Sequence, residues 1–406
     1  MKYLFVHQNF PGQYLHIVRH LQADPANDVV FITEANANQI TGVRRVVYDV
    51  GRKQRSDIHS AAREFELAAH RADKVAAAAR QLRMLGFTPD IIIGHHGWGE
   101  LLNLVDVWPG VPMLGYFEFY YHDHGYDVNF DPEFPMNEGF QSGVRAMNVI
   151  NHLALSLGQH GQTPTVFQRD AYPDWAQPQI KLLPEGTRLD LCKPNPAAHT
   201  KRLSIGDFHI DLGDRLITYV ARNLEPYRGY HTIMRALPEI LKTRPDAKVV
   251  MLGGDETSYG PKFADSSWKD YFIGKLAGQY DTSRVLMPGQ VDYDLYLKLL
   301  QRSDAHVYLT YPFVASWSLR EALACGCVVI AADVSSVTEF VSHDRNGLLV
   351  PALDHARLAR QVLDVLEAPK QSKRLRRAAR KYAEAELDMD QHIAQFEARI
   401  AEITSK

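Results

Sequence analysis

The sequence lacks any run of about 18 apolar residues, so it predicts no membrane-spanning helix. Its start, MKYLFVHQNFPGQY, enters a strand-like run at once and lacks the charged-then-apolar pattern of a secretion signal. Only three cysteines occur: Cys192, Cys325 and Cys327. An odd number without framework spacing is typical of a reducing compartment, and two cysteines one residue apart make a poor zinc site. We therefore expect a cytoplasmic protein.

An excess of charge of one sign is also missing. The 406 residues carry a formal net charge of −3, which gives no argument for binding nucleic acid. Apolar residues make up 46% and charged residues 23%, as in ordinary globular proteins. A chain of this length exceeds one ordinary core and predicts about two domains.

Three common functional fingerprints are absent. No G-x-G-x-x-G follows the first apolar run, no G-x-x-x-x-G-K-[ST] occurs anywhere, and there is no G-x-S-x-G. These absences remove the common dinucleotide fingerprint, the P-loop and the serine-hydrolase elbow. A nucleotide site in this chain has to use other residues.

What the sequence does contain is a regular alternation of apolar, β-rich runs with helical patterns. Most runs are continuous, as in parallel strands buried on both faces. In the first half we expect strands at residues 3–7, 29–33, 44–50, 90–96, 111–117 and 180–184. The alternation restarts with RLITYVAR, KVVMLGGD, RVLMPGQV, AHVYLTYP and CVVIAAD.

This pattern predicts an α/β protein with two doubly wound, parallel-sheet domains and right-handed crossovers. Residues 193–214, rich in Pro, Gly and polar side chains, are interpreted as the region between the domains. We place the domains at 1–200 and 201–387. The helix expected at 388–406 is predicted to pack back on the first domain; its apolar residues at helical spacing are Ile393, Phe396, Ile400 and Ile403.

Two polar clusters resemble metal ligands but have simpler explanations. Asp292-Tyr293-Asp294 forms a D-x-D, yet it follows a strand and opens a helix, where Asp is favoured as a cap. His122-Asp123-His124 has no partner cluster, and a polar loop explains it. We expect neither a metal nor another cofactor.

Candidate phosphate-binding residues follow the first strand of each half. Arg222 and Arg228, in ARNLEPYRGYHT, lie where open α/β sheets bind ligands. Two guanidinium groups there would clamp a diphosphate, although either would equally serve as a surface arginine. Gly12, in NFPGQY, permits close approach of the backbone to a ligand or simply makes a turn.

Two further loops concentrate His, carboxylate and aromatic residues after apolar strands: HHGWGE (95–100) and YFEFYYHDHGYDVNFDPEF (116–134). Aromatic faces cover the C–H patches of sugars, and carboxylates accept hydrogen bonds from sugar hydroxyl groups. Core packing does not explain so many polar groups in neighbouring loops. We interpret them as part of a ligand site.

The stretch YPFVASWSLREALACGC (311–327) leads from a strand through a loop into a helix that contains Glu321. Ser318 and Glu321 have the S-x-x-E spacing of a capping box, which alone would account for the Glu. Further on, SKRLRRAARKYAEAE predicts a basic helix around 372–382. This helix is either a solvated charged face or a surface for anionic lipid headgroups.

Taken in order, these segments resemble the retaining GT-B glycosyltransferases of family 4. The resemblance covers most of residues 180–370, through ARNLEPYRGYHTIMRALPEILKTRPDAKVVMLGGD, RVLMPGQVDYDLYLKLLQRSDAHVYLT, SWSLREALACGCVVIAADVSSVTEFV and NGLLVP. In the first half, VHQNFPGQY, HHGWGE and YFEFYY…FDPEFP look like a bacterial subgroup of that family. The resemblance implies two Rossmann-like domains that face each other across a cleft.

The resemblance also implies a site for a nucleoside-diphosphate sugar. Arg222 and Arg228 would bind the diphosphate, with Arg228 where the family usually has Lys. Glu321 would hold the ribose as the second Glu of E-x7-E. Gly12 and Gln13 would lie beside the diphosphate. Backbone N–H groups near the helix start would help to hold the donor, at Val314, Ala315, Ser316 and Trp317.

Two positions depart from the family pattern. Phe313 replaces the first Glu of E-x7-E, which in the family usually reaches the donor sugar. Glu118 stands where many members carry a His, so the resemblance implies that Glu118 or His96 would contact the transferred sugar during catalysis.

We therefore expect a metal-independent hexosyltransferase-type enzyme that moves a sugar, with retention, from a nucleoside-diphosphate donor to a glycan or lipid-linked acceptor. The resemblance points to bacterial cell-surface polysaccharide or glycolipid assembly, and the basic helix is compatible with peripheral contact at the inner face of the membrane. Two alternatives stay open: a nucleotide-sugar epimerase on the same architecture, and a non-catalytic nucleotide-sugar-binding protein.

Overall fold

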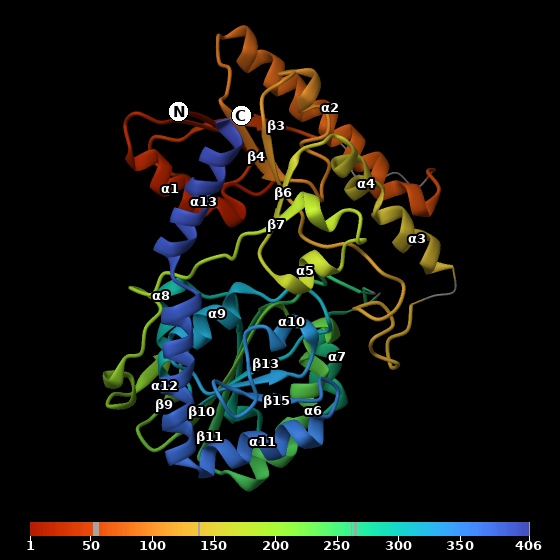
Figure 1. Cartoon of the computed structure of the whole chain (residues 1–406). Helices are drawn as coiled ribbons and strands as arrows, with labels where there is room; N and C mark the ends of the chain where they lie inside the picture. Colours follow the sequence, from red (N-terminus) through yellow and green to blue (C-terminus); the bar gives the residue numbers. More distant parts are fainter. Residues whose placement is uncertain (52–56, 137–138, 261, 264–265, 406) are drawn as a thin grey trace. The chain divides into compact units, whose positions relative to one another are not determined.

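The computed structural model describes residues 1–51, 57–136, 139–260, 262–263 and 266–405. The chain forms two compact units (Figure 1). The N-terminal unit comprises Met1–Asp123, Asn137–Glu185 and Asp390–Lys406, and the C-terminal unit comprises His124–Met136 and Gly186–Met389. The main passage between the units therefore falls at Glu185, against residue 200 in the sequence-based division.

The N-terminal unit is built on a seven-stranded parallel sheet in the order β3-β2-β1-β4-β5-β6-β7. Its strands are β1 (Lys2–Val6), β2 (Asp28–Glu34), β3 (Arg44–Tyr48), β4 (Ile91–His95), β5 (Met113–Tyr116), β6 (His160–Thr163) and β7 (Ile180–Leu182). The central strands are buried over almost their whole length. This burial explains why they read as continuous apolar runs.

Helices cover the faces of this sheet (Figure 1). They are α1 (Leu15–Ala23), α2 (Arg63–Met84), α3 (Phe140–Met147), α4 (Val149–Ser156), α5 (Val166–Asp170) and α13 (Met389–Thr404). The apolar stripe of α13 joins the same core as β1 and α1: Phe396, Ile400 and Ile403 are buried there, with Ile393 packed beside them. At its polar edge, Glu397 accepts from His20 at 2.8 Å. The far end of the sequence thus completes the core of the N-terminal unit.

The C-terminal unit contains a six-stranded parallel sheet in the order β12-β11-β10-β13-β14-β15. Its strands are β10 (Arg215–Asn223), β11 (Ala247–Gly254), β12 (Val285–Gly289), β13 (Ala305–Tyr308), β14 (Val329–Ala332) and β15 (Leu348–Val350). A small antiparallel hairpin, β8 (Leu203–Ile205) with β9 (Phe208–Ile210), precedes the sheet. Residues 193–214, expected to separate domains, therefore fold as part of this unit.

The helices of the C-terminal unit are α6 (Tyr230–Thr243), α7 (Trp268–Lys275), α8 (Tyr293–Arg302), α9 (Trp317–Ala324), α10 (Ser335–Thr338), α11 (His355–Glu367) and α12 (Pro369–Glu386). The basic segment of the sequence is α12, which packs against α9 and α11. None of the helices that the structure describes is long and apolar enough to cross a membrane.

Both sheets reverse their winding direction beside their first strand. In the N-terminal unit the reversal lies between β1 and β4, and in the C-terminal unit between β10 and β13. Open α/β sheets bind ligands at the carboxyl ends of the strands at such a point, because the connections leave there in opposite directions. The fold therefore predicts one ligand-binding position in each unit.

Candidate functional site

In the C-terminal unit, the loops after β10 and β13 meet at the point of reversal. Arg222 belongs to the end of β10, and Arg228 ends the short helix that follows it. The loop after β13 leads through Phe313 into α9. A backbone hydrogen bond from the N–H of Tyr311 to the carbonyl of Tyr227, 3.0 Å long, ties the two loops together. The fold thus brings together the predicted phosphate-binding and ribose-binding segments.

Arg228 is held in an aromatic cage. Its guanidinium carbon lies 5.8 Å from the ring centre of Tyr227, 5.1 Å from that of Tyr259 and 5.9 Å from that of Phe313. One end group, Nη1, donates to Thr310 Oγ1 at 3.1 Å and to the carbonyl of Val314 at 3.3 Å. Within the described part of the chain, Nε and Nη2 make no hydrogen bond. A guanidinium group commonly binds a phosphate through two parallel N–H donors of this kind.

Among the residues that the structure describes, no carboxylate forms an ion pair with Arg228. Burial opposes the charge, but the electrostatic influence of Tyr308, Tyr259 and Tyr227 raises the pKa of Arg228. Glu225, an acid whose charge influences Arg228, is fully buried, and burial raises its pKa to about 7. Near neutral pH this carboxyl group is only partly ionised. The site therefore keeps net positive charge for an anion.

The raised pKa of Glu225 predicts that this residue makes the fold less stable as the pH rises. Between its usual pKa, 4.5, and about 7, the folded chain holds a proton that the unfolded chain releases, so the free energy of unfolding falls through this interval. The expected loss is about 3 kcal/mol. Glu225→Gln should remove this loss, because an amide carbonyl still accepts from the N–H groups of Ser258 and Tyr259. Urea unfolding of both proteins at pH 5 and pH 8 measures the difference; parallel pH profiles would exclude the effect.

The other predicted donor-binding residues of this unit lie at the end of β10 and between β13 and α9, and Phe313 is itself part of the cage. Arg222 is exposed and makes no ion pair within the described residues. Phe313 is buried, with its ring 5.0 Å from that of Tyr259, so it contributes packing where the family pattern has a carboxylate. The N–H groups of Val314 and Ala315 make no hydrogen bond with described residues, whereas the N–H of Ser316 donates to Tyr308 Oη at 2.8 Å. Trp317 is the first residue of α9.

Glu321 is positioned by two tyrosines of α8. Tyr293 Oη donates to Oε1 at 2.7 Å, and Tyr296 Oη donates to Oε2 at 2.6 Å. Burial raises the pKa of Glu321, and the two tyrosine hydrogen bonds oppose this shift. Oε1 also accepts a weak hydrogen bond from the thiol of Cys192 at 4.0 Å, which a ligand hydroxyl group can replace, and Oε2 has a second lone pair for another hydroxyl group.

The capping-box explanation of Glu321 is wrong. The residue that caps α9 is Ser316, not Ser318, and Glu321 lies in the second turn with its side chain directed to α8. Sequence reasoning missed the tyrosine pair because DYDLY was explained by capping alone. Asp292 does cap α8, accepting from Leu295 N at 2.8 Å. The three-residue spacing of the tyrosines, which places both on one face of the helix, was the available signal.

Gly229 allows the loop after β10 to pack closely against the residues that follow β13. It has φ of +73°, and an added Cβ would lie 2.3 Å from Cβ of Leu309. Gly229→Ala should therefore lower the free energy of unfolding by the cost of positive φ and, in addition, by about 1–3 kcal/mol for the clash. Gly278 is a matched control, since its φ is +74° and no atom of a described residue lies within 4 Å of an added Cβ. Equal losses for the two variants in urea unfolding would contradict the close approach.

Residues 124–136 pack against this site although they come from the first half of the sequence. Asp131 accepts from Tyr311 Oη at 2.7 Å and pairs with His231 at 3.0 Å. Burial opposes ionisation of Asp131, but the hydrogen bonds from His231 and Tyr311 hold its pKa below the usual value. Asp127 accepts from Tyr227 Oη at 2.7 Å. The segment thus orients Tyr227 of the cage and also Tyr311, whose ring lies 5.1 Å from that of Tyr227.

In the N-terminal unit, the corresponding position holds a histidine–carboxylate pair. His95 ends β4, and its Nε2 lies 3.4 Å from Oε2 of Glu118, which follows β5. Because His95 Nδ1 accepts from the N–H of Gly97, its proton resides on Nε2, toward Glu118. The exposed ring of Trp98 stacks on His95. These residues line a small cavity with Tyr121 and Asn151.

His95, rather than the predicted His96, therefore faces Glu118. His96 is fully buried against Gly115 and Phe117, and burial lowers its pKa to about 3. Adjacent positions in a strand point to opposite faces, so only one of the two histidines can reach the loops. His7, after β1, packs edge-on against His95 at 5.7 Å between ring centres, and burial lowers its pKa to about 3.

Gly12 and Gln13 begin the short helix after β1. An added Cβ at Gly12 would lie 3.0 Å from the ring of His7, so the glycine allows the loop to close over that histidine. The amide nitrogen of Gln13 is buried without a hydrogen-bond partner in the described chain. Among the described residues, no group of three His, Cys, Asp or Glu side chains is arranged to hold a metal ion.

Comparison with known families identifies the class of this chain. Residues 25–192 match the model described as glycosyl transferase family 4 group, and residues 202–382 match that of glycosyl transferases group 1. The first match contains every strand of the N-terminal sheet except β1, and the second contains the C-terminal sheet. The two halves of the chain are therefore glycosyltransferase domains of the family 4 group and of group 1.

Curated relatives match part of the chain. Glycogen synthase of Mycobacterium tuberculosis is 26% identical over 176 residues, which are 43% of this chain and 40% of the relative. D-inositol 3-phosphate glycosyltransferase of Streptomyces avermitilis is 26% identical over 210 residues, 51% of this chain and 43% of that protein. The matched region thus spans about two-fifths of the length of these relatives.

Solved structures match the whole fold. Sucrose-phosphate synthase from Thermosynechococcus elongatus has a TM-score of 0.77 at 18% identity and covers 100% of this chain and 99% of its own. HepE from Anabaena, solved in complex with UDP and glucose, has a TM-score of 0.69 at 18% identity and covers 99% of each chain. At this level of identity the likeness shows the fold, and the GT-B architecture predicted from the sequence is confirmed.

Proposed function

We propose that this protein transfers a sugar from a nucleoside-diphosphate donor to a glycan or lipid-linked acceptor, with retention of the anomeric configuration. The observation that supports the proposal is the hydrogen bond between the loop that carries Arg228, after β10, and the loop that leads to Glu321, after β13, at the reversal point of the C-terminal sheet. A buried cation with two uncommitted donor groups suits a diphosphate, and a tyrosine-oriented carboxylate suits the hydroxyl groups of a ribose.

The chemical work assigned to the arginines is stabilisation of the leaving group. As the bond from the anomeric carbon to the diphosphate oxygen breaks, negative charge grows on that oxygen. The fixed charges of Arg228 and Arg222 favour this charge, as does the start of α9. We propose that the transfer needs no divalent metal, since these cations lie at the strand ends where the diphosphate would bind. The complexes of HepE with UDP and UDP-glucose support a uridine nucleotide as the first candidate.

The N-terminal unit is assigned to the acceptor and to the transferred sugar. Glu118, oriented by His95, would accept from a sugar hydroxyl group, and the exposed ring of Trp98 offers an apolar face to a sugar ring. Gly12 and Gln13 would lie beside the donor. His96 is withdrawn from this role, because its ring is enclosed in the core. We further propose a role in bacterial cell-surface polysaccharide or glycolipid assembly.

The test is a thermal-shift panel of UDP, GDP, ADP, CMP and dTDP and their common sugar conjugates, in the presence of EDTA. A ligand at 100 times its Kd adds about 2.7 kcal/mol to the stability of the state that it binds. One nucleotide with a clear shift would support the donor site, and its sugar conjugates would then be incubated with the enzyme. Epimerised donor without an acceptor would favour an epimerase, and binding without consumption with any acceptor a binding protein. No shift with any nucleotide would contradict the proposal.

A further inference from the structure

A second cavity lies at the opposite edge of the C-terminal sheet, where the strands begin. It has a volume of about 710 Å³, is open to solvent on one side, and is lined by α12, residues at the ends of α9 and α11, and residues 194–199. Arg215, the first residue of β10, and Asp304, directly before β13, form part of its wall. Because β10 has nine residues, the two edges of the sheet are roughly 25–30 Å apart. A diphosphate bound beside Arg228 therefore does not reach this cavity.

The wall of this cavity carries a large excess of positive charge. Six Lys and Arg side chains line it, against the two carboxylates of Asp304 and Glu384, although the whole chain is slightly acidic. The cationic residues are Arg215, Lys373, Arg376, Arg377, Arg380 and Lys381. Like charges at this density repel one another and lower the stability of α12, unless an anion compensates them.

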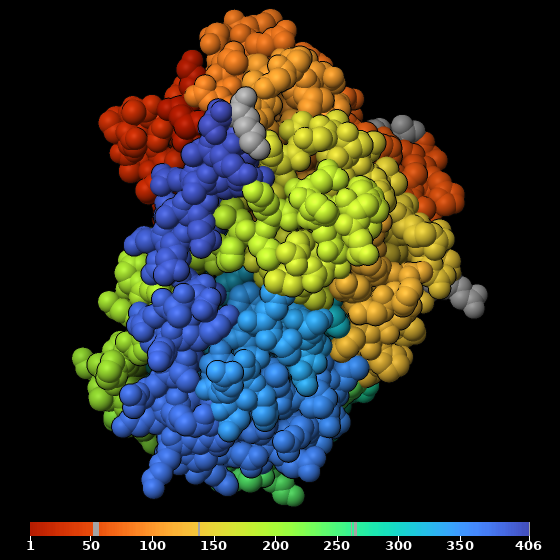
Figure 2. Space-filling view, in the orientation of Figure 1, coloured from red at the N-terminus to blue at the C-terminus, as the bar shows by residue number. Residues whose placement is uncertain are grey.

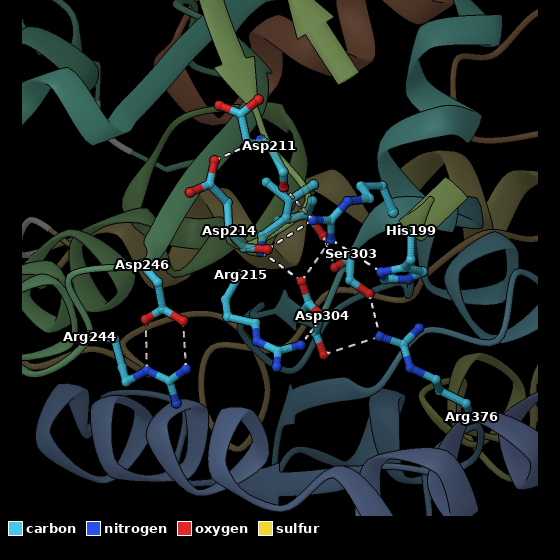
Figure 3. Close-up of polar contacts among 12 residues, drawn as sticks. His199, Asp211, Asp214, Arg215, Arg244, Asp246, Ser303, Asp304 and Arg376 are labelled. Atoms are coloured by element: carbon cyan, nitrogen blue, oxygen red, sulfur yellow. Dashed lines mark hydrogen bonds and ion pairs between the residues drawn. The ribbon is translucent and has the colours of Figure 1, made fainter. Parts of the chain in front are cut away.

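The two carboxylates of the wall already have ion-pair and hydrogen-bond partners. Oδ2 of Asp304 accepts from Arg302 Nη1 at 2.9 Å and from the N–H of Leu216 at 2.8 Å, and Oδ1 lies 3.4 Å from Arg215 (Figure 3). Glu384 pairs with Arg380 at 2.7 Å. Neither carboxylate is left to neutralise the other cations of the wall.

Two of the arginines are held in place by neutral groups. Arg376 donates to the carbonyls of Gly326 and Ser303, and Arg380 donates to those of Ala324 and Cys192. These carbonyls fix both guanidinium groups. Among the described residues the charge of Arg376 has no carboxylate partner, whereas Arg380 also pairs with Glu384. They include the last carbonyl of α9 and one just beyond it, so the arginines also cap that helix. On this side of the cavity, the positions of the two guanidinium groups are therefore fixed before any ligand binds.

Three more cations form a stripe along α12. Lys373, Arg377 and Lys381 are four residues apart, lie on one face of the helix and are exposed. They make no ion pair with any described residue. Figure 2 shows α12 (blue) at the surface, with the yellow-green segment that contains residues 194–199 beside it. Apolar side chains, Pro194, Pro196, Val365 and Leu366, supply part of the remaining lining, which also includes the polar side chains of Asn195, His199, Gln301 and Ser372.

From this arrangement we infer that the cavity is a second binding site, for a phosphate ester whose body is partly apolar. Its volume lies within the range of small-molecule sites, about 300–1,000 Å³. The fixed guanidinium groups match the oxygens of a phosphate, and the proline and aliphatic surfaces match an apolar body. Such a ligand comes either as a soluble phosphate ester or as the headgroup region of an anionic phospholipid; the site chemistry is the same.

The test compares the complete protein with the triple variant Lys373→Gln, Arg377→Gln, Lys381→Gln. These three side chains have no partners within the described chain, so their loss should leave the fold intact. A control triple, Lys201→Gln, Lys242→Gln, Arg345→Gln, removes the same charge from exposed positions that line no part of the cavity. The probes are phenyl phosphate, inorganic phosphate and phenol, measured by calorimetry. Vesicles of phosphatidylcholine with and without 30% phosphatidylglycerol are measured by flotation.

We expect saturable binding of phenyl phosphate, weaker binding of inorganic phosphate and none of phenol. The affinity should fall at least tenfold in the cavity triple and stay within twofold in the control triple and in Arg222→Gln. If binding of the phosphatidylglycerol vesicles is lost in the cavity triple alone, the lipid is the source of the ligand. No saturable binding of either kind, or equal losses in the two triples, would overturn the inference. Loss of phenyl phosphate binding in Arg222→Gln would place the probe at the donor site instead and overturn it as well.

Discussion

Arg228→Gln is expected to slow sugar transfer by about 10²–10³-fold, whereas Arg228→Lys should keep activity within about tenfold of the original protein. Removal of one preorganised donor that stabilises developing charge costs a factor of this size. A lysine keeps the positive charge in the same aromatic cage, and the family that this chain resembles usually has Lys at the position. The measurement is the rate of nucleoside diphosphate release from the donor identified in the thermal-shift panel.

Because Arg228 is buried, its replacement must be separated from a general loss of stability. Urea unfolding of each variant shows whether the fold is intact, and Arg345→Gln controls for the loss of one positive charge from an exposed position in the same unit. If the Gln and Lys variants are equally impaired while both are folded, the geometry of the guanidinium and not its charge is decisive. Unchanged activity in the Gln variant would remove Arg228 from the site.

Glu321→Gln is expected to raise the Kd of the preferred nucleotide by about 10–100-fold with little change in thermal stability. A hydrogen bond to a charged acceptor contributes about 1.5–3 kcal/mol, and the amide cannot accept from two ribose hydroxyl groups through both of its terminal atoms. The fold should tolerate the change. The amide oxygen can accept from one of Tyr293 and Tyr296, and its nitrogen can donate to the hydroxyl oxygen of the other. Calorimetric titration with the nucleotide provides the measurement.

A matched control for Glu321 lies on the neighbouring helix. Asp294→Asn removes one carboxylate from the exposed surface of α8, next to Tyr293, and should leave nucleotide affinity unchanged. Loss of affinity in both variants would point to a long-range effect of charge. An unchanged Kd in Glu321→Gln would mean that the carboxylate serves only to hold the two tyrosines.

The architecture could be predicted because buried parallel strands leave a plain signal. Continuous apolar runs between helical patterns predict two parallel sheets, and the ends of the strands then indicate where ligands bind. The capping role of Asp292 was equally accessible, because it depends on neighbours within one turn of helix.

Contacts between distant segments could not be predicted in the same way. The pairing of Asp131 with His231 joins positions 100 residues apart and leaves no periodic pattern in either segment. The choice between His95 and His96 depended on where the strand ends, since a shift of one residue exchanges the two faces. The aromatic cage of Arg228 brings together three loops, and each aromatic residue taken alone is unremarkable in sequence.

The interleaving of the two units determines the order in which the molecule can finish folding during its synthesis. A ribosome delivers residues 1–185 long before α13, yet Phe396, Ile400 and Ile403 belong to the core of the N-terminal unit. Domains usually fold as the nascent chain emerges, beginning with the first. Here the N-terminal unit is synthesised first, but the apolar surface that α13 covers stays exposed until the C-terminal unit has been translated. Residues 124–136, in contrast, are synthesised before the C-terminal unit that they join. The first domain to be synthesised is therefore the last to be completed.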